Sequence, residues 1–238
     1  MNITQAKWIN GILHYFNQLN NHETLDAVAP VQYVEDFLVP ALDTTNRFCV
    51  RDTAGATETL LADQPGGVVQ LLLTNAAEIQ LAGIDWADER QFCAGYGPIA
   101  EFRTRFTTLP VNATTAVFGL CGDHNAAIDT VAESIWFRFD FSGDATVETD
   151  DTATETSKVS TGVTVVANAW HVYKIDMSNQ ADCHFYIDGV RVATGTTFDM
   201  SNSATLVLQP VARLDKGADA LNLGVMEVDY VKIWSKRS

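Results

Sequence analysis

Pairs of carboxylates are the residues of this sequence whose type and spacing come nearest to catalysis. Glu227 and Asp229 are two residues apart, and a second acidic group runs from Glu148 to Glu155. Retaining cleavage of a glycosidic bond needs two carboxyl groups held about 5 Å apart. The first pair has no further carboxylate on its segment, and the second group has the composition of a loop. Acidic side chains that only solvate turns explain both, and we expect no enzymatic activity.

Acidic and amide side chains also form two candidate calcium groups, because hard oxygen ligands suit that ion. The first group is Asp123 with Asn125. The second group consists of Asp144, Glu148, Asp150 and Asp151. Neither matches a recognised calcium loop. We therefore expect no obligatory cofactor, with calcium as the ion that these residues could hold.

The best ligand-binding candidates combine an aromatic platform with hydrogen-bond donors. Trp136 and Arg138 alternate on one strand-like segment, and Arg103 and Arg105 alternate on another. If the two segments are neighbours on a concave sheet, these outward side chains form one glycan-binding surface. The structural alternative is that cross-strand charge pairs stabilise an exposed sheet face, which the tryptophan covers.

Other well-marked chemistry is missing from the sequence. It contains no nucleophile elbow, phosphate-binding glycine loop or dinucleotide glycine pattern. The cysteines are far apart and lack zinc spacing, which favours free, buried thiols over disulfides or a metal site. They are Cys49, Cys93, Cys121 and Cys183. His171 and His184 lie on strand-like segments, where a structural histidine is the default.

Composition and charge exclude several classes of partner. The 238 residues include 30 acidic and 15 basic side chains, for a formal net charge of −15. Nucleic acid and anionic membrane surfaces would repel such a chain, and its apolar runs are too short to span a bilayer. The first residues show no secretion signal, so we expect the protein to be made in the cytoplasm.

Short strands from about residue 45 onward must position these candidate residues. Residues 101–106 and 134–141 alternate between apolar and polar side chains, as strands with one buried face do. In the second segment the apolar parity includes Phe141. Residues 144–160 are rich in Thr, Ser and acidic side chains, and they predict an exposed hairpin or loop.

Two further segments carry specific backbone signals. Asp188-Gly189 accepts positive φ angles and predicts a two-residue hairpin turn within residues 183–192. Residues 225–234 do not alternate cleanly, and a bulge near Tyr230 would explain the change of parity. No segment between the strands is helical enough to supply parallel crossovers, so the sheets should be antiparallel.

The N-terminal residues 3–19 predict a helix, because large apolar side chains recur at spacings of three and four. These side chains are Trp8, Ile12, Phe16 and Leu19. An isolated helix of this length is marginal in water, so the stripe needs a surface to contact. We divide the chain into a helical arm (1–22), a linker (23–44) and a β-sandwich (45–238), with the arm as an assembly contact.

Three segments together resemble the second half of a concanavalin A-like jelly roll, the fold shared by laminin G-like modules and family 16 glycoside hydrolases. They are residues 169–176, 185–192 and 226–234. The resemblance implies an all-β, two-sheet antiparallel jelly-roll sandwich, here with a short N-terminal helical arm. In family 16 hydrolases one strand carries Glu-x-Asp-x-x-Glu as nucleophile and general acid. That motif is missing from this sequence.

The arm and the jelly roll also resemble accessory virion proteins of tailed bacteriophages, such as head decoration or fibre proteins. This resemblance implies a non-enzymatic structural module on the virion surface, a homo-oligomer whose partners are other virion or assembly proteins. The alternative is a glycan-binding module, and a third hypothesis is a degenerate glycoside hydrolase. We expect neither nucleic acid nor a membrane as partner.

Overall fold

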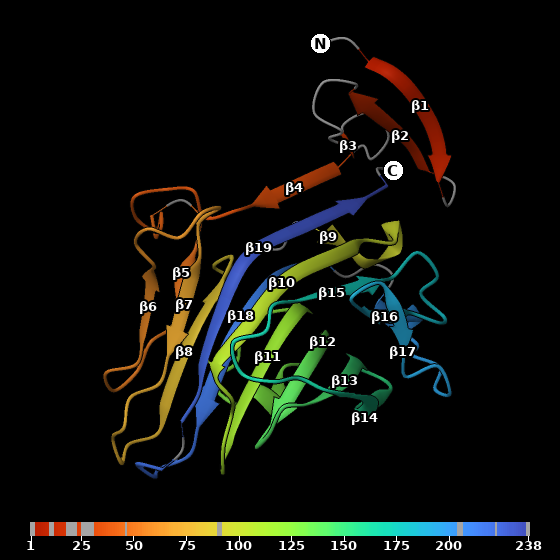
Figure 1. Cartoon of the computed structure of the whole chain (residues 1–238). Helices are drawn as coiled ribbons and strands as arrows, with labels where there is room; N and C mark the ends of the chain where they lie inside the picture. Colours follow the sequence, from red (N-terminus) through yellow and green to blue (C-terminus); the bar gives the residue numbers. More distant parts are fainter. Residues whose placement is uncertain are drawn as a thin grey trace.

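The protein is built almost entirely from antiparallel strands in two large sheets that pack face to face (Figure 1). The computed structural model describes residues 3–9, 12–17, 23–24, 31–45, 47–89, 92–203, 207–221 and 223–236. This architecture confirms the predicted all-β, two-sheet antiparallel sandwich. Within those ranges, no helix has the length and apolar character needed to cross a membrane.

Sheet I has the strand order β17-β16-β15-β10-β19-β7-β6, and β4 also pairs with β19. Its strands are β4 (Val31–Glu35), β6 (Thr57–Leu60), β7 (Val69–Leu72), β10 (Ile99–Thr108), β15 (His171–Asp176), β16 (His184–Ile187), β17 (Val190–Val192) and β19 (Val225–Ser235).

Sheet II has the strand order β14-β13-β12-β11-β18-β8-β5, and β9 also pairs with β18. Its strands are β5 (Cys49–Val50), β8 (Gln80–Asp85), β9 (Phe92–Cys93), β11 (Thr114–Cys121), β12 (Glu133–Asp140), β13 (Asp144–Asp151), β14 (Glu155–Thr164) and β18 (Val207–Lys216). Short 3₁₀ helices lie in the connections: η1 (Ala94–Tyr96), η2 (Ile128–Thr130) and η3 (Ser201–Ser203).

The core lies between the inner faces of the two sheets. Phe118 of sheet II packs edge-on against Tyr173 of sheet I, with ring centroids 4.8 Å apart. Phe102 and Phe106 of β10 are also fully buried in this cluster, as the alternation of residues 101–106 predicts. Large aromatic side chains on the inward parity of both sheets therefore account for the packing.

The two backbone signals in the sequence are confirmed. Ile187 pairs with Val190 across the two-residue turn, and both Asp188 and Gly189 have positive φ angles. On β19 the register against β10 skips Asp229, which is the bulge expected near Tyr230. Residues 144–160 form a hairpin, made by β13 and β14. The predicted exposure is wrong for β13, because this strand pairs with β12 inside sheet II and buries Val147, Glu148 and Thr149.

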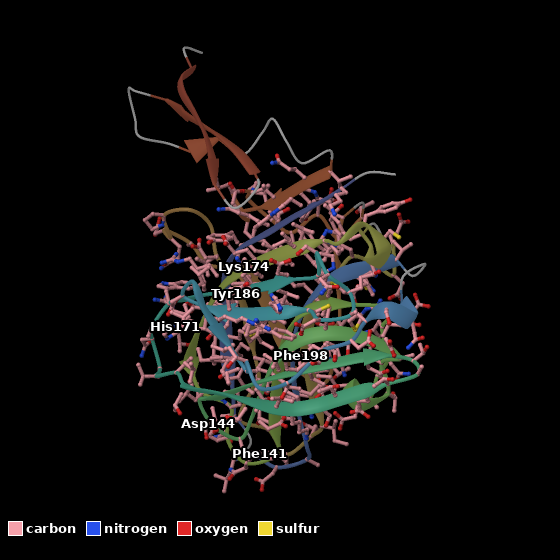
Figure 2. All side chains as sticks on the ribbon, turned by 90° about the vertical axis from the view of Figure 1, so that its right-hand side faces the viewer. Phe141, Asp144, His171, Lys174, Tyr186 and Phe198 are labelled. Atoms are coloured by element: carbon pink, nitrogen blue, oxygen red, sulfur yellow. The ribbon has the colours of Figure 1, made fainter. Side chains whose placement is uncertain are left out.

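Phe141 departs from the predicted pattern. The sequence places it inward with the apolar parity of β12, but the strand ends at Asp140 and the Phe141 side chain is 58% exposed. Its φ angle of 60° is left-handed, so the chain turns immediately after the strand and rotates this side chain outward. Figure 2 shows it near the lower edge of the molecule.

The predicted N-terminal helix is wrong over the residues that the structure describes. Residues Ile3–Ile9 form β1 and Ile12–Asn17 form β2, which pair antiparallel, and β3 (Glu23–Thr24) completes a separate three-stranded sheet. Ile, Thr, Trp, Tyr and Phe favour strands, and the sequence Asn10-Gly11 between them is the strongest short-range hairpin signal. In Figure 1 this N-terminal sheet lies at one end of the molecule, beyond β4.

Strand β4 falls inside the segment 23–44 that the sequence assigns to a linker. Residues 31–35 instead pair with β19, from Val231 to Ser235, and Phe37 is buried in the core. Part of the predicted linker therefore belongs to the sandwich, and the three-part division of the chain is otherwise still a prediction.

Candidate binding site

The four residues predicted to form one glycan-binding surface do not share a face. Arg103 and Arg105 lie on β10 in sheet I, whereas Trp136 and Arg138 lie on β12 in sheet II. All four point outward, so the whole sandwich separates the two pairs. Local alternation gives the side of a sheet that a residue faces, but it does not identify the sheet.

On sheet I, the two arginines stack on Trp170. The guanidinium carbon lies 4.6 Å from the ring centroid for Arg103 and 4.5 Å for Arg105. Arg103 also forms an ion pair with Asp229, and Arg105 Nε donates to Glu227 Oε2 at 2.6 Å. For Arg103 and Arg105, the predicted alternative to glycan binding therefore fits well: cross-strand charge pairs with neighbours on the same face neutralise both arginines.

On sheet II, a segment of the chain covers the predicted platform. Trp136 is buried among apolar side chains that include Ile128 and Val131 of the 122–132 segment. Arg138 is equally buried, and its Nη1 donates to Asp129 Oδ1 at 2.5 Å. A sugar ring cannot reach the tryptophan while this segment is in place.

The candidate calcium groups do not converge. Asp144 begins β13 and Asp151 ends it, so these carboxylates are separated by about 20 Å of extended chain. Asp150 and Asp151 accept backbone hydrogen bonds from the following turn, and Asn125 accepts one from Ala127 N. Within the described ranges, no group of three or more His, Cys, Asp or Glu side chains is placed to hold a metal ion.

The histidines, the cysteines and the predicted assembly residues are placed as follows by the structure. His171 Nδ1 lies 2.7 Å from Asp188 Oδ2, and His184 Nε2 lies 3.2 Å from Asp182 Oδ2. All four cysteines are free, and burial raises the pKa of Cys183 to about 12. Trp8 lies on β1 and Ile12 and Phe16 lie on β2, while Leu19 falls outside the described residues.

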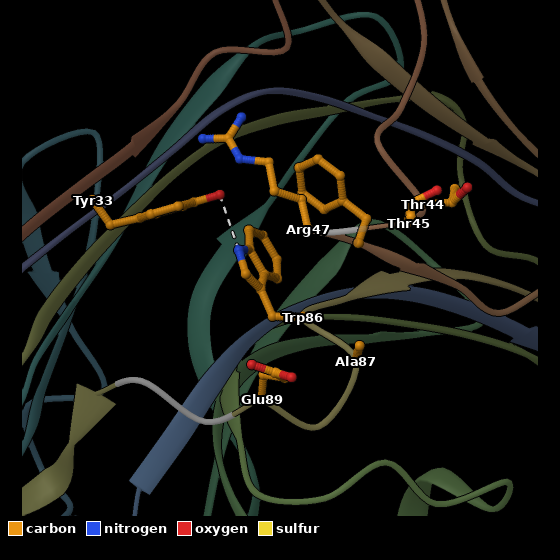
Figure 3. Close-up of a pocket in the computed structure, with 8 residues that line it drawn as sticks. Tyr33, Thr44, Thr45, Arg47, Trp86, Ala87 and Glu89 are labelled. Carbon is orange, nitrogen blue, oxygen red and sulfur yellow. Dashed lines mark hydrogen bonds between the residues drawn. The ribbon is translucent and has the colours of Figure 1, made fainter.

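A pocket of about 470 Å³ opens at one end of the sandwich (Figure 3). Its aromatic wall comes from three separate parts of the chain: Tyr33 on β4, Phe48 before β5, and Trp86 directly after β8. Trp86 Nε1 donates to Tyr33 Oη at 2.9 Å, and Phe48 packs edge-on against Trp86 with centroids 5.1 Å apart. The rings therefore hold each other in place.

Polar side chains surround this aromatic wall. Thr44, Thr45, Arg47 and Glu89 line the pocket and are exposed to solvent. Arg47 Nη1 lies 2.9 Å from the buried carboxylate of Glu35, which leaves the rest of the guanidinium to face outward. Hydroxyl, guanidinium and carboxylate groups are thus arranged around an apolar surface, as in ligand sites that orient a polar molecule.

The turn that carries Trp86 is held by a buried amide. Ala87 and Asp88 both have φ angles of 58°, and Glu89 N closes the turn on Trp86 O at 2.9 Å. Gln209 Oε1 accepts from the backbone N–H groups of Trp86 and Asp88, and its Nε2 donates to Asp88 Oδ1 at 2.8 Å. Left-handed non-glycine residues persist where their surroundings enforce them, and they cluster at functional sites.

Electrostatics keeps the pocket's hydroxyl group protonated. Burial, followed by the nearby carboxylate of Glu35, raises the pKa of Tyr33 well above its usual value. The phenol is therefore neutral at physiological pH, and it accepts the Trp86 hydrogen bond as a hydroxyl. Its proton points toward Glu35 Oε2, at 3.4 Å.

No local sequence pattern predicts this pocket. Tyr33 lies in the predicted linker, and Phe48 and Trp86 have no local pattern that separates them from core residues. The one available signal was compositional: Trp86 precedes Ala87-Asp88-Glu89, a polar run at the end of an apolar strand. This run predicts a turn after the strand, but it does not predict which distant residues contact Trp86.

Three solved structures are similar to this chain over most of its length. A LamA variant from Z. galactanivorans, in complex with laminaritriose and laminaritetraose, matches with a TM-score of 0.61 and 12% identity over 87% of this chain and 100% of that one. The laminarinase from Rhodothermus marinus matches with a TM-score of 0.58 and 13% identity, over 87% of this chain and 97% of that one. The Emp47p carbohydrate recognition domain matches with a TM-score of 0.56 and 9% identity, over 86% of this chain and 96% of that one.

The fold is that of the concanavalin A-like lectins and glucanases. No protein-family model matches the sequence. A search of curated proteins gives no match either. Because this fold is shared by catalytic glucanases and by a carbohydrate recognition domain, it does not decide between catalysis and binding.

Within this concanavalin A-like sandwich, three of the candidate catalytic carboxylates, Glu148, Glu227 and Asp229, lie beside arginines, and Arg138 also pairs with Asp140. On sheet II, Asp140 and Glu148 both lie beside Arg138, at 3.0 and 3.5 Å. Burial raises the pKa of Glu148, and Arg138 opposes that rise. On sheet I, Glu227 is held by Arg105 and by Gln70 Nε2 at 3.0 Å.

Proposed function

We propose that this protein is a non-catalytic carbohydrate-binding module and that the pocket lined by Tyr33, Phe48 and Trp86 is its binding site. The observation that carries the proposal is the pocket itself, in which half-buried Tyr33 presents its ring, the buried rings of Phe48 and Trp86 back it, and polar groups stand at the rim. The apolar face of a sugar ring packs on aromatic side chains while its hydroxyl groups form directional hydrogen bonds. Two of the similar structures are described by their carbohydrate recognition or by bound oligosaccharides.

The chemistry of the pocket supports binding without cleavage. Glu89 is the one carboxylate among the residues that line it, whereas glycoside hydrolysis uses two. Glu148, Glu227 and Asp229 on the sheet faces lie beside arginines, and a carboxylate in an ion pair is a weak nucleophile and a poor proton donor. A degenerate hydrolase is therefore the less favoured alternative.

Titration calorimetry with neutral oligosaccharides of the laminarin series tests this proposal. Arg47→Ala and Glu89→Ala should each weaken binding by about tenfold, because they remove exposed hydrogen-bonding groups from the rim. Lys158→Ala is the matched control, since Lys158 is 49% exposed and ion-paired to Asp140, as Arg47 is 45% exposed and ion-paired to Glu35. Unchanged affinity in both pocket variants would overturn the assignment of the site.

The same preparation separates binding from catalysis. We expect no reducing sugar to be released from laminarin on prolonged incubation with the pure protein. Steady release that is lost in Glu89→Gln would show that the pocket is catalytic and would overturn the non-enzymatic part of the proposal.

A second function is favoured by the separate N-terminal sheet. Among the described residues, β1, β2 and β3 pair only with one another and with neither large sheet. We infer that this sheet attaches the sandwich to a larger assembly, with a phage particle and its head or fibre proteins as the proposed partner. A module that binds carbohydrate through its sandwich and its assembly through an arm would combine both functions.

Deleting residues 1–24 tests this second function. We expect a soluble, β-rich monomer that melts cooperatively, still binds oligosaccharide, and no longer self-associates or binds particles. An insoluble or molten product would show that the N-terminal sheet is part of the folded core, and the attachment hypothesis would fall.

A further inference from the structure

One straight row of side chains crosses the outer face of sheet I. Arg191, Tyr186, Lys174, Glu101 and Lys232 are successive cross-strand partners on β17, β16, β15, β10 and β19. Direct cross-strand partners point to the same side of a sheet, so all five face outward together. Figure 2 shows Lys174 and Tyr186 side by side on this face.

The cations of this row are evenly spaced. Arg191 and Lys174 are separated by one intervening strand, and so are Lys174 and Lys232. Because neighbouring strands lie about 4.8 Å apart, the backbone positions that carry these cations recur about every 10 Å along the line. The row thus carries cationic side chains on alternate strands, although the chain as a whole has a net charge of −15.

The two lysines are available to a ligand. Lys174 Nζ lies 4.0 Å from the ring centroid of Tyr186, and Lys232 Nζ lies 4.0 Å from that of Tyr230. Tyr230 Oη donates to Glu101 Oε1 at 2.8 Å, so the carboxylate between the two lysines is bound to the tyrosine. Neither lysine forms an ion pair with any residue that the structure describes, whereas Arg191, the third cation of the row, lies 3.7 Å from Asp182.

The aromatic rings also fix the positions of the ammonium groups. A cation held over a ring loses rotational freedom before a ligand arrives, so less conformational entropy is lost on binding. Lys174, Lys232 and both tyrosines are half-buried, and the side chains therefore lie along the sheet surface. The row is a preformed surface for an extended anionic partner.

We propose that this row binds a linear anionic polysaccharide that carries an acidic group on every second sugar. A peptide in the β conformation turns every second side chain to the same side, about every 6.8 Å, and this repeat does not match positions about 10 Å apart. Nucleic acid places phosphates about 3.4 Å apart along each strand, far more densely than the row, and the net charge of the chain repels it. A polysaccharide whose acidic groups are sparse and regularly spaced fits the row better than a β-peptide or a nucleic acid.

This surface is distinct from the pocket. Tyr33 pairs with Ile233, which is buried in the core, and so its ring lies on the inner side of sheet I, whereas the row lies on the outer side. The inference therefore goes beyond the proposed function, and either can fail without the other.

Binding of hyaluronan oligosaccharides, which carry a carboxylate on every second sugar, tests the proposal in low salt. The double variant Lys174→Gln/Lys232→Gln should lose at least about tenfold in affinity, and about 0.5 M NaCl should abolish binding by the wild type. Glu101→Gln should bind a few times more tightly, because it removes the one negative charge of the row. Lys158→Gln, an exposed lysine on sheet II, is the matched control and should bind as the wild type does.

Three outcomes would overturn the proposal. The first is no measurable binding of hyaluronan fragments, and the second is binding that the lysine double variant leaves unchanged. The third is preferential binding of single-stranded oligo-dT over hyaluronan, which would assign the row to nucleic acid. Arg47→Ala, which alters only the pocket, should leave hyaluronan binding unchanged, so that failure of the pocket and failure of the row are distinguishable.

Discussion

On both sheets, outward-facing positions alternate with buried apolar ones and carry arginines. These arginines differ in exposure between the two sheets. Arg103 on sheet I has a side chain that is 35% exposed, whereas Arg138 and Arg213 on sheet II are each 3% exposed. The difference comes from the 122–132 segment, which lies over sheet II and has no counterpart among the described residues over sheet I. Outward parity on a strand is therefore not the same as exposure.

Covering a polar face requires each buried charge to have a complete set of partners. Arg213 donates to Asp215 and to the carbonyl oxygens of Asn125 and Ala126, so the covering segment itself supplies two acceptors. On sheet I, water can reach Arg103, although Glu227 on the same face is buried and is held by Arg105 and Gln70. The two faces should therefore respond very differently to loss of one charge.

The largest expected effect is the loss of Arg213. Arg213→Ala should lower the free energy of unfolding by about 2 to 4 kcal/mol, because it removes a buried side chain and leaves the half-buried carboxylate of Asp215 and the carbonyl groups of Asn125 and Ala126 without their donor. Arg103→Ala is the matched change on the open face and should cost about 1 kcal/mol or less. Urea denaturation measures both, and equal losses would show that the two faces are not different.

A glycine beside the covered tryptophan should give the next largest effect. A Cβ added at Gly119 would lie 2.4 Å from Ile135 O and 2.7 Å from Trp136 Cβ, so β11 and β12 would have to separate. We expect Gly119→Ala to destabilise the fold by about 1 to 3 kcal/mol. Gly195→Ala, which has open space around it, is the control and should change stability very little. A small loss in Gly119→Ala would mean that this face is loosely packed.

A buried carboxyl group at the edge where the sheets meet should make stability depend on pH. Glu58 on β6 accepts from Gly83 N on β8 at 2.6 Å, and burial raises its pKa from 4.5 to about 7. Between these values the folded state binds more protons than the unfolded state, so the Glu58 contribution is present at low pH and is lost as pH rises through about 7. Glu58→Gln should remove this loss.

Denaturation at about pH 5 and about pH 8 measures that contribution, which we expect to be on the order of 1 kcal/mol because Glu58 is only partly buried. The variant should gain stability relative to the wild type at the higher pH. Parallel pH profiles for the two proteins would show that Glu58 does not titrate in this range, and the pH dependence would then belong to the covered face of sheet II.

The smallest expected effect belongs to the lysine row on sheet I. Lys174→Gln removes one half-exposed cation from the ring of Tyr186, which should change the free energy of unfolding by about 0.5 to 1 kcal/mol. A loss of several kcal/mol in thermal or urea unfolding would show that the lysine has a structural role. The contrast between the open and the covered face would then be much weaker.

The N-terminal residues show where periodicity alone misleads. Trp8, Ile12 and Phe16 lie at helical spacing, but the same stretch is rich in residues that favour strands and contains Asn10-Gly11. Both patterns occur in one short segment, and the structure pairs β1 with β2. The Asn10-Gly11 dipeptide was the better guide, because it favours the backbone angles of a hairpin turn. Apolar spacing indicates only which side chains would share one face of a helix.

The sequence by itself determined the all-β class, the inward side chains of residues 101–106 and 135–139, the Asp188-Gly189 turn and the bulge near Tyr230, because each depends on a few consecutive residues. The tertiary structure alone decided that β10 and β12 belong to different sheets and that Trp136 is covered. It also decided that Tyr33, Phe48 and Trp86 meet in one pocket. Contacts between residues far apart in sequence depend on the pairing of every strand between them, and no local pattern encodes that pairing.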